Sequence, residues 1–247
     1  MPTPKVPAAD ATLRLLTFLA SRRAPVAAAR IAEELELPRS RTYDLLATLV
    51  EHGYVMHLEQ ERLYGLGPSA HELSGAYLRQ EPLARIGRRV VERMVDAVGE
   101  SGHLAVLHGR DVLYVVEERA RNRPSLVTDV GVRIPAHLTA SGRAILAHLP
   151  APQLRALYGT AADFAARTDA PGPATPKELR ELLTAVRAEG VARESGEVSD
   201  EMGSVASVVR DHAGWPAAAV ALTFVEARVG PAERERLAAA VRSGAEE

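Results

Sequence analysis

The stretch RIAEELELPRSRTYDLLATLVEHGYVMHLEQERLYGLGP, residues 30–68, decides the fold of the first part of the chain. After a short segment with apolar residues at helical spacing, Glu36-Leu37-Pro38 forms a turn, because a proline disfavours helix in the residue before it. A helix is then expected over residues 39–52, with leucines recurring along one face. Two short β-like runs, 54–58 and 63–66, flank a polar tetrapeptide and predict a β-hairpin.

Two further helices are expected upstream of this turn. Asp10 can cap the first, in which Leu13, Leu16 and Ala20 recur at helical spacing. The second covers roughly residues 27–34. Three helices, a tight turn and a hairpin in this order are the outline of a winged helix-turn-helix unit.

The third helix of such a unit enters the DNA major groove, so its first turn and the hairpin carry the expected contacts. Arginine bonds guanine edges or phosphates, serine and threonine bond either, and tyrosine reaches the backbone. The residues expected to contact double-stranded DNA are Arg39, Ser40, Arg41, Thr42, Tyr43 and, near the hairpin tip, Arg62.

The charge of this region does not by itself indicate nucleic-acid binding. Residues 1–67 hold eight Arg or Lys and eight Asp or Glu, so their net charge is zero, and that of the whole chain is −2. A DNA contact must therefore depend on where the cations lie rather than on their number. A protein-interaction module with the same three helices and hairpin stays an alternative at this point.

The rest of the chain predicts a second, larger domain of mixed helix and strand. We expect a DNA-binding domain over residues 1–67, a linker helix over 68–81 and a further domain over 82–247. In that further domain, the expected strands cover residues 103–107, 112–117, 126–130, 204–210 and 217–225. The expected helices cover residues 82–99, 137–150, much of 151–190, and 232–242.

Composition and motifs exclude several classes of function. The chain has no cysteine, which removes disulfides, thiol catalysis and Cys-based zinc or iron–sulfur sites. Its eight histidines show no His-x-x-x-His spacing, and no Gly-x-Ser-x-Gly elbow or Walker-type glycine loop occurs. We therefore expect neither catalytic residues nor a metal or cofactor.

The sequence also lacks signals for export or membrane insertion. Its first residues, MPTPKVPAAD, contain no apolar core of a signal peptide. No uninterrupted apolar run reaches the roughly 20 residues that a membrane span needs. We expect a soluble, cytoplasmic protein without a membrane partner.

Several short motifs follow one another in a distinctive order. In the first domain they are Ile31-Ala32, Leu37-Pro38-Arg39-Ser40, Leu45-Leu46-Ala47-Thr48-Leu49, Gly53-Tyr54-Val55 and Tyr64-Gly65-Leu66-Gly67. Downstream they are PAHLTASGRAILA (135–147) and SVASVVRDHAGWPAAAVALTF (204–224). With these segments in this order, nearly the whole chain resembles the IclR family of bacterial transcriptional regulators.

The resemblance implies a DNA-binding transcriptional regulator, a repressor in the first instance with an activator as the alternative, controlled by a small molecule. It implies an α+β chain in which residues 82–247 form a GAF or profilin-like antiparallel sheet with flanking helices. Such modules hold a ligand between the sheet and its covering loops. By the resemblance, the effector pocket is lined by Leu138, Ala140, Ser141, Glu194, Ser204, Ala221 and Thr223.

The chain departs from the family pattern at several positions. Asp44 stands where many relatives carry Arg or another non-acidic residue, and Arg143 replaces a common Lys. Ser204 and Val208 stand where some relatives have Cys and where Pro is usual, respectively. Operator sequence and effector identity are therefore not carried over from the family.

The expected pocket residues suit an acidic ligand. Backbone amides of Ala140 and Ser141 at a helix start, with the hydroxyls of Ser204 and Thr223, would hold a carboxylate such as an aromatic acid. Glu194 would select a ligand that also has a donor group. Alternatively, Ser141 and Thr139 merely cap their own helix.

The expected assembly is a homo-oligomer, a dimer or a dimer of dimers. Two recognition helices would then read the half-sites of a near-palindromic operator. The rival hypothesis is a metabolite-binding module that acts only through protein partners, which would lack a steep salt dependence of DNA binding.

Overall fold

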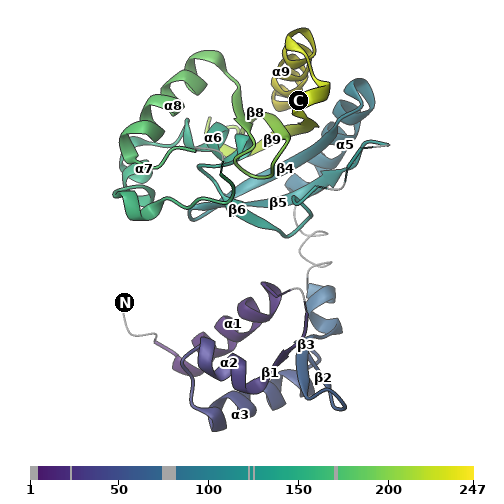
Figure 1. Ribbon diagram of the computed structural model, residues 1–247, viewed down its shortest axis with the longest axis vertical. Coiled ribbons are helices and arrows are strands. Elements are labelled where there is room, and N and C mark those ends of the chain that lie inside the picture. The colour runs from purple at the N-terminus through teal and green to yellow at the C-terminus, as the bar shows by residue number, and fades with distance from the viewer. Residues whose placement is uncertain (1–4, 23, 74–81, 122, 125, 170–171) are drawn as a thin grey trace. The chain divides into compact units, whose positions relative to one another are not determined.

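The computed structural model describes residues 5–22, 24–73, 82–121, 123–124, 126–169 and 172–247 of the chain. The chain divides into two compact units, residues 1–80 and 81–247 (Figure 1). Residues 74–81, which make up most of the linker helix expected at 68–81, lie outside the described residues.

The first unit has the predicted order of three helices and a hairpin. These helices are α1 (Pro7–Ala20), α2 (Ala28–Glu34) and α3 (Arg39–Glu51), and the described strands of the unit are β1 (Val26–Ala27), β2 (Val55–Leu58) and β3 (Leu63–Leu66). Residues 68–73, the first part of the expected linker helix, are helical as well. The strands form one sheet of order β1-β3-β2. Leu15, Ile31 and Leu46, one from each helix, are buried together in its core.

Two features of α1 differ from the sequence-based expectation. The helix begins at Pro7, a residue suited to a first turn because it has no amide proton to satisfy. Asp10 therefore lies inside the first turn and does not cap the helix. The buried face includes Leu15 and Leu19, whereas Leu13 is 65% exposed. A leucine-rich helix offers more than one apolar stripe, and only packing selects the buried one.

The second unit is built on a six-stranded antiparallel sheet of order β6-β5-β4-β9-β8-β7. Its strands are β4 (Ser101–His108), β5 (Asp111–Glu118), β6 (Arg133–Pro135), β7 (Ala192–Ser195), β8 (Met202–Arg210) and β9 (Pro216–Val225). Its helices are α5 (Pro82–Val98), α6 (Ala140–Leu146), α7 (Ala151–Leu157), α8 (Pro176–Glu189) and α9 (Pro231–Glu246). The predicted α+β class is confirmed.

Helices cover both faces of this sheet (Figure 1). On one face α5 and α9 pack against the strands and each other, and on the other face α6 lies against β8 and β9 with α8 beyond it. Small side chains on the α6 side, among them Ala206, Ala219 and Ala221, let this helix approach closely, and all its residues are buried. The start of α6 is thereby held directly over the sheet.

One predicted strand is wrong, and two strands of the second unit escaped prediction. Residues 126–130 form an irregular loop in which Val127 and Val130 are exposed, while Thr128 is buried. The edge of the sheet is instead β6. The strand β7, with the sequence ARES, is too short and too polar to show an apolar alternation. No helix in the described ranges is long and apolar enough to cross a membrane.

Candidate DNA-binding surface and effector pocket

The first turn of α3 presents a polar surface. Arg39, Ser40 and Tyr43 are exposed, and Arg41 is half-buried. The expectation that Thr42 is exposed with them is wrong, because Thr42 is 1% exposed and its hydroxyl donates to the Pro38 carbonyl at 3.1 Å. Thr42 lies one helical turn before the buried Leu46, so it shares the face that packs into the core.

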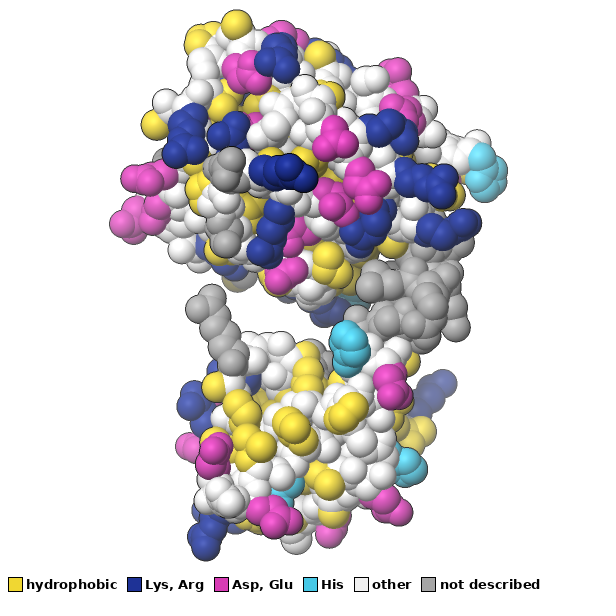
Figure 2. Space-filling model, turned by 90° about the vertical axis from the view of Figure 1, so that its right-hand side faces the viewer, with side chains coloured by type: hydrophobic (Ala, Val, Ile, Leu, Met, Phe, Trp, Pro, Cys, Tyr) yellow, Lys and Arg dark blue, Asp and Glu magenta, His cyan; other side chains and the backbone are white. Residues whose placement is uncertain are grey.

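Some arginines of this unit are held in ion pairs, and others are not. Glu34 pairs with both Arg22 and Arg30, at 3.5 and 3.6 Å. In the described part of this unit, the arginines outside any ion pair are Arg14, Arg39, Arg41 and Arg62. On the face seen in Figure 2, basic and acidic side chains are interspersed over this unit. Positive charge is nevertheless available at the start of α3 and on the hairpin, although the net charge is zero.

The hairpin has the form of a wing. Arg62 lies at its tip, exposed and in a left-handed conformation with φ of 55°. The rings of His57 and Tyr64 stack across the two strands with centroids 4.4 Å apart. At its base a Cβ on Gly67 would lie 2.3 Å from the Gly53 carbonyl oxygen, so only glycine fits. The wing is thus a defined element that presents one cation.

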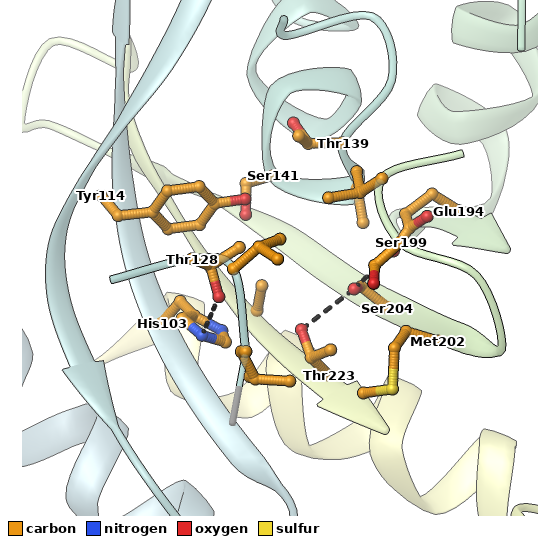
Figure 3. A pocket seen from close by; sticks show the side chains of 15 residues that line it. His103, Tyr114, Thr128, Thr139, Ser141, Glu194, Ser199, Met202, Ser204 and Thr223 are labelled. Carbon is orange, nitrogen blue, oxygen red and sulfur yellow. Dashed lines mark hydrogen bonds between the residues drawn. The ribbon is translucent and has the colours of Figure 1, made fainter. Parts of the chain in front are cut away.

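A cavity of about 30 Å³ lies in the second unit between the sheet, the start of α6 and the loop at 126–128 (Figure 3). Six of the seven residues expected to line a pocket do so, and they are Ala140, Ser141, Glu194, Ser204, Ala221 and Thr223. Leu138 does not line it. Its buried side chain faces Gly172 instead, where an added Cβ would come within 2.7 Å.

The remaining lining residues were not predicted from the sequence. They are His103, Tyr114, Leu126, Val127, Thr128, Thr139, Val198, Ser199 and Met202. His103 and Tyr114 carried a usable signal, because each is a polar side chain beside or within the apolar run of its strand. The loop residues carried none, since their place depends on the tertiary fold.

Hydrogen bonds connect the polar residues of the cavity in two groups (Figure 3). Ser204 Oγ donates to Glu194 Oε1 at 2.7 Å and lies 3.0 Å from Thr223 Oγ1. On the other side Thr128 Oγ1 and His103 Nε2 are 2.8 Å apart. Glu194 Oε2 is buried and has no hydrogen-bond partner among the described residues.

Burial determines the protonation states of the titratable residues that line the cavity. It raises the pKa of Glu194 to about 7, against the opposing effect of the Ser204 hydrogen bond. Burial, with a contribution from Arg119, lowers the pKa of His103 to about 4, so this ring is neutral at pH 7. Burial and then the charge of Glu194 raise the pKa of Tyr114. No Lys or Arg occurs among the described lining residues.

The start of α6 is fixed independently of any ligand. Thr139 caps the helix by accepting the Gly142 amide at 2.9 Å, so the capping role falls to Thr139 and not to Ser141. Arg143 is 2% exposed and donates to the carbonyls of His137 and Arg193 at 2.8 and 2.6 Å. The helix therefore presents Ser141 to the cavity from a rigid support.

A winged helix-turn-helix joined to a domain with an enclosed polar cavity defines a DNA-binding regulator controlled by a ligand. Comparison with known proteins agrees. Residues 8–59 match the family described as the IclR helix-turn-helix domain, and residues 75–247 match the family described as bacterial transcriptional regulator IclR C-terminal. The chain belongs to the IclR family of bacterial transcriptional regulators.

Individual relatives cover most of the chain. The Pca regulon regulatory protein of Pseudomonas putida is 31% identical over 225 residues, which are 91% of this chain and 76% of that protein. The transcriptional repressor IclR of Escherichia coli is 24% identical over 219 residues, 88% of this chain and 79% of that protein. Both relatives are named as regulatory proteins, the second as a transcriptional repressor.

Solved structures share the fold at lower identity. An IclR transcriptional regulator from Alicyclobacillus acidocaldarius superposes with a TM-score of 0.84 at 21% identity, covering 98% of this chain and 97% of that one. An IclR homologue from Microbacterium hydrocarbonoxydans, in complex with 4-hydroxybenzoate, has a TM-score of 0.77 at 23% identity and covers 96% and 95% of the two chains.

Proposed function

We propose that this chain is a cytoplasmic repressor that binds its operator as a homo-oligomer and changes its DNA affinity when an acidic effector occupies the cavity of the second unit. Residues 1–67 would bind DNA, 68–81 would connect the domains, and 82–247 would bind the effector. The observation that carries the proposal is the enclosed polar cavity at the start of α6. The E. coli relative named as a repressor supports the sign of regulation.

The effector is proposed to be a carboxylic acid, with an aromatic acid as the leading case. The structure from M. hydrocarbonoxydans with its bound 4-hydroxybenzoate supports this choice. A cavity of about 30 Å³ has room for one or two waters rather than for a benzoate ring. Binding must therefore open the cavity, and Val127 in the loop at 126–128, at 43% exposed, is the most exposed of the described lining residues.

Self-association is proposed to use the outer face of α1. Leu13 is 65% exposed and Val6 just before the helix is 61% exposed, which is unusual for large apolar residues on one short segment. A second copy of the chain would cover both side chains and place two recognition helices on successive half-sites.

A gel shift tests the regulator as a whole. The purified protein is titrated against the DNA upstream of its own gene, with competitor DNA and a series of salt concentrations. A specific complex whose affinity falls steeply with salt is expected, because arginine contacts to phosphate release counterions. Absence of a complex with every upstream fragment would contradict the proposal.

Substituting the arginines at the start of α3 makes this test specific to the proposed DNA-binding surface. The double substitution Arg39→Ala with Arg41→Ala is expected to weaken operator binding and to lower the salt slope by about one unit for each phosphate group that is no longer neutralised. The control, Arg155→Ala with Arg180→Ala, removes two exposed arginines of the second unit. Operator affinity that survives the first pair of substitutions would show that α3 docks differently.

A further inference from the structure

The cavity of the second unit has two walls that leave different hydrogen bonds open. This difference assigns a chemical class to the effector. The assignment rests on the proposed function, because it requires that the effector occupies this cavity.

On the first wall the hydroxyl protons of Ser204 and Thr223 are already used. Ser204 Oγ donates to Glu194 Oε1 at 2.7 Å, and a serine hydroxyl has a single proton. Thr223 Oγ1 lies 3.0 Å from Ser204 Oγ, so Thr223 is the donor in that bond. The hydrogen bonds run from Thr223 through Ser204 to the carboxylate, so these three residues offer a ligand only acceptors.

Glu194 Oε2 is the open acceptor of this wall. Glu194 is 5% exposed and lines the cavity, and its Oε2 is buried and makes no hydrogen bond of ordinary geometry in the described ranges, although the Val198 amide lies close enough to lower the pKa of the carboxyl. A buried acceptor without a donor is costly, so a ligand that brings a proton to Oε2 gains the most from this wall.

The second wall has a proton to give. The hydroxyls of Tyr114 and Ser141 lie side by side across the cavity (Figure 3). Two hydroxyls hold two protons, and a bond between them uses one, so one proton is left for a ligand. Tyr114 is protonated at neutral pH like an ordinary tyrosine, and burial raises its pKa further. This wall suits an acceptor such as a carboxylate.

The charges around the cavity limit the ligand to one carboxylate. No Lys or Arg occurs among the described lining residues, and His103 is neutral above pH 6. The other charged neighbours of Glu194 are Glu197 and Arg143, which pair with each other at 2.7 Å. Two further cations, Arg119 and Arg167, act on His103 and Tyr114 and not on Glu194. A second carboxylate beside an ionised Glu194 would therefore meet like charge with no uncommitted cation next to it.

We propose that the effector is a hydroxy monocarboxylic acid, whose hydroxyl donates to Glu194 Oε2 and whose carboxylate accepts from the Tyr114 and Ser141 wall. The same arrangement disfavours dicarboxylates and acids that lack a donor group.

Two matched series of acids test the class by calorimetric titration of the full chain at pH 8, where Glu194 is ionised. The small series is glycolate, fluoroacetate and malonate, and the large series is 4-hydroxybenzoate, 4-fluorobenzoate and terephthalate. Fluorine is close to a hydroxyl in size but has no proton. In the series whose size suits the cavity, the hydroxy acid is expected to bind at least about tenfold more tightly than both the fluoro acid and the dicarboxylic acid.

Glu194→Gln tests the residue that makes the distinction. Its amide both donates and accepts, so the preference for hydroxyl over fluorine is expected to fall and the dicarboxylate to gain. Lowering the pH to 6 should shift the preferences of the unsubstituted chain in the same direction. Glu181→Gln, at an exposed position of α8, should keep the original preferences.

Three results are distinguishable. Equal binding of the hydroxy and fluoro acids overturns the assignment, and so does failure of the hydroxy acids of both sizes to bind. If a compound of another class releases the operator while the hydroxy acids do not, the regulator stands and only the effector class is wrong. If the chain binds no operator, the proposed function itself fails.

Discussion

Glu194 carries a carboxyl group that the fold buries beside a serine rather than beside a cation. Its pKa in the folded chain, about 7, lies above its ordinary value of 4.5. The folded state therefore binds this proton more tightly than the unfolded state. The resulting stabilisation is complete below pH 4.5 and is lost as the pH rises through 7.

Glu194→Gln should consequently be more stable than the unsubstituted chain at pH 8 and gain little at pH 4.5. The difference is at most on the order of 3 kcal/mol, from about 1.4 kcal/mol per pKa unit. Denaturant unfolding of the second unit, followed from pH 4.5 to 8, measures it. Glu181→Gln, with a side chain 67% exposed, is the control. Parallel pH profiles for the Glu194→Gln and unsubstituted chains would refute the argument.

Single residues also show which features of the site could be predicted from the sequence and which could not. Glu194 and Ser204 were placed correctly on one cavity through the family resemblance, because homologous strands keep their register. The protonation of Glu194 was not predictable, since it depends on how completely the fold excludes water. Thr42 was misplaced for a related reason. Its polar side chain suggests exposure, but its hydroxyl satisfies itself on the helix backbone and lets the residue be buried.

Among the elements, the helix α6 forms one wall of the cavity. Gly142 allows this helix to pack closely against the backbone at Ala136. A Cβ at this position would lie 2.1 Å from the Ala136 carbonyl oxygen and 2.5 Å from its Cα. These are backbone atoms, so the conflict is not relieved by a side-chain rotation.

Gly142→Ala should therefore displace the start of α6 and destabilise the second unit, by roughly 2 kcal/mol or more, within the range of overpacked core substitutions. Thermal unfolding measures this loss, and ligand titration should show a parallel loss of effector binding. Gly230→Ala places the same methyl group in open space, so its cost should be limited to that of alanine in place of glycine at the N-cap of α9, below the cost of Gly142→Ala. A Gly142→Ala chain of unchanged stability would mean that α6 shifts freely.

The strand that was wrongly predicted and the strand that was missed were misjudged for the same physical reason. Residues 126–130 have the apolar, β-branched composition of a strand, yet they cover the cavity as a loop, because Thr128 bonds His103 in place of a neighbouring strand. The strand β7 looks polar in the sequence, yet it pairs with β8 over four residues, with Ala192 and Glu194 facing inward. Local composition decides neither case, because edge strands are defined by their partners.

At the scale of the whole molecule, effector and operator must influence each other equally. If an effector weakens operator binding by a given factor, operator DNA weakens effector binding by the same factor. In the proposed homo-oligomer, two recognition helices would also double the phosphate contacts, which would link self-association to salt dependence. The outer face of α1 is where these two properties can be separated experimentally.

Leu13→Glu should break self-association without unfolding the first unit. Leu13 is 65% exposed, so the folded unit loses little buried apolar area, and glutamate is a good helix former. In an interface between two copies the same change buries charge on both sides, which is strongly unfavourable. Sedimentation should show a smaller species, and the salt slope of operator binding should fall by about half.

Ile86→Glu is the matched control, since Ile86 is an aliphatic residue on a helix of the second unit and is 57% exposed. It should leave both the sedimentation and the salt slope unchanged. If Ile86→Glu dissociates the assembly and Leu13→Glu does not, self-association uses the second unit, and the half-site spacing is then set by the effector domains. If Leu13→Glu dissociates the assembly but keeps the full salt slope, a single copy makes all the phosphate contacts, and a palindromic operator is not required.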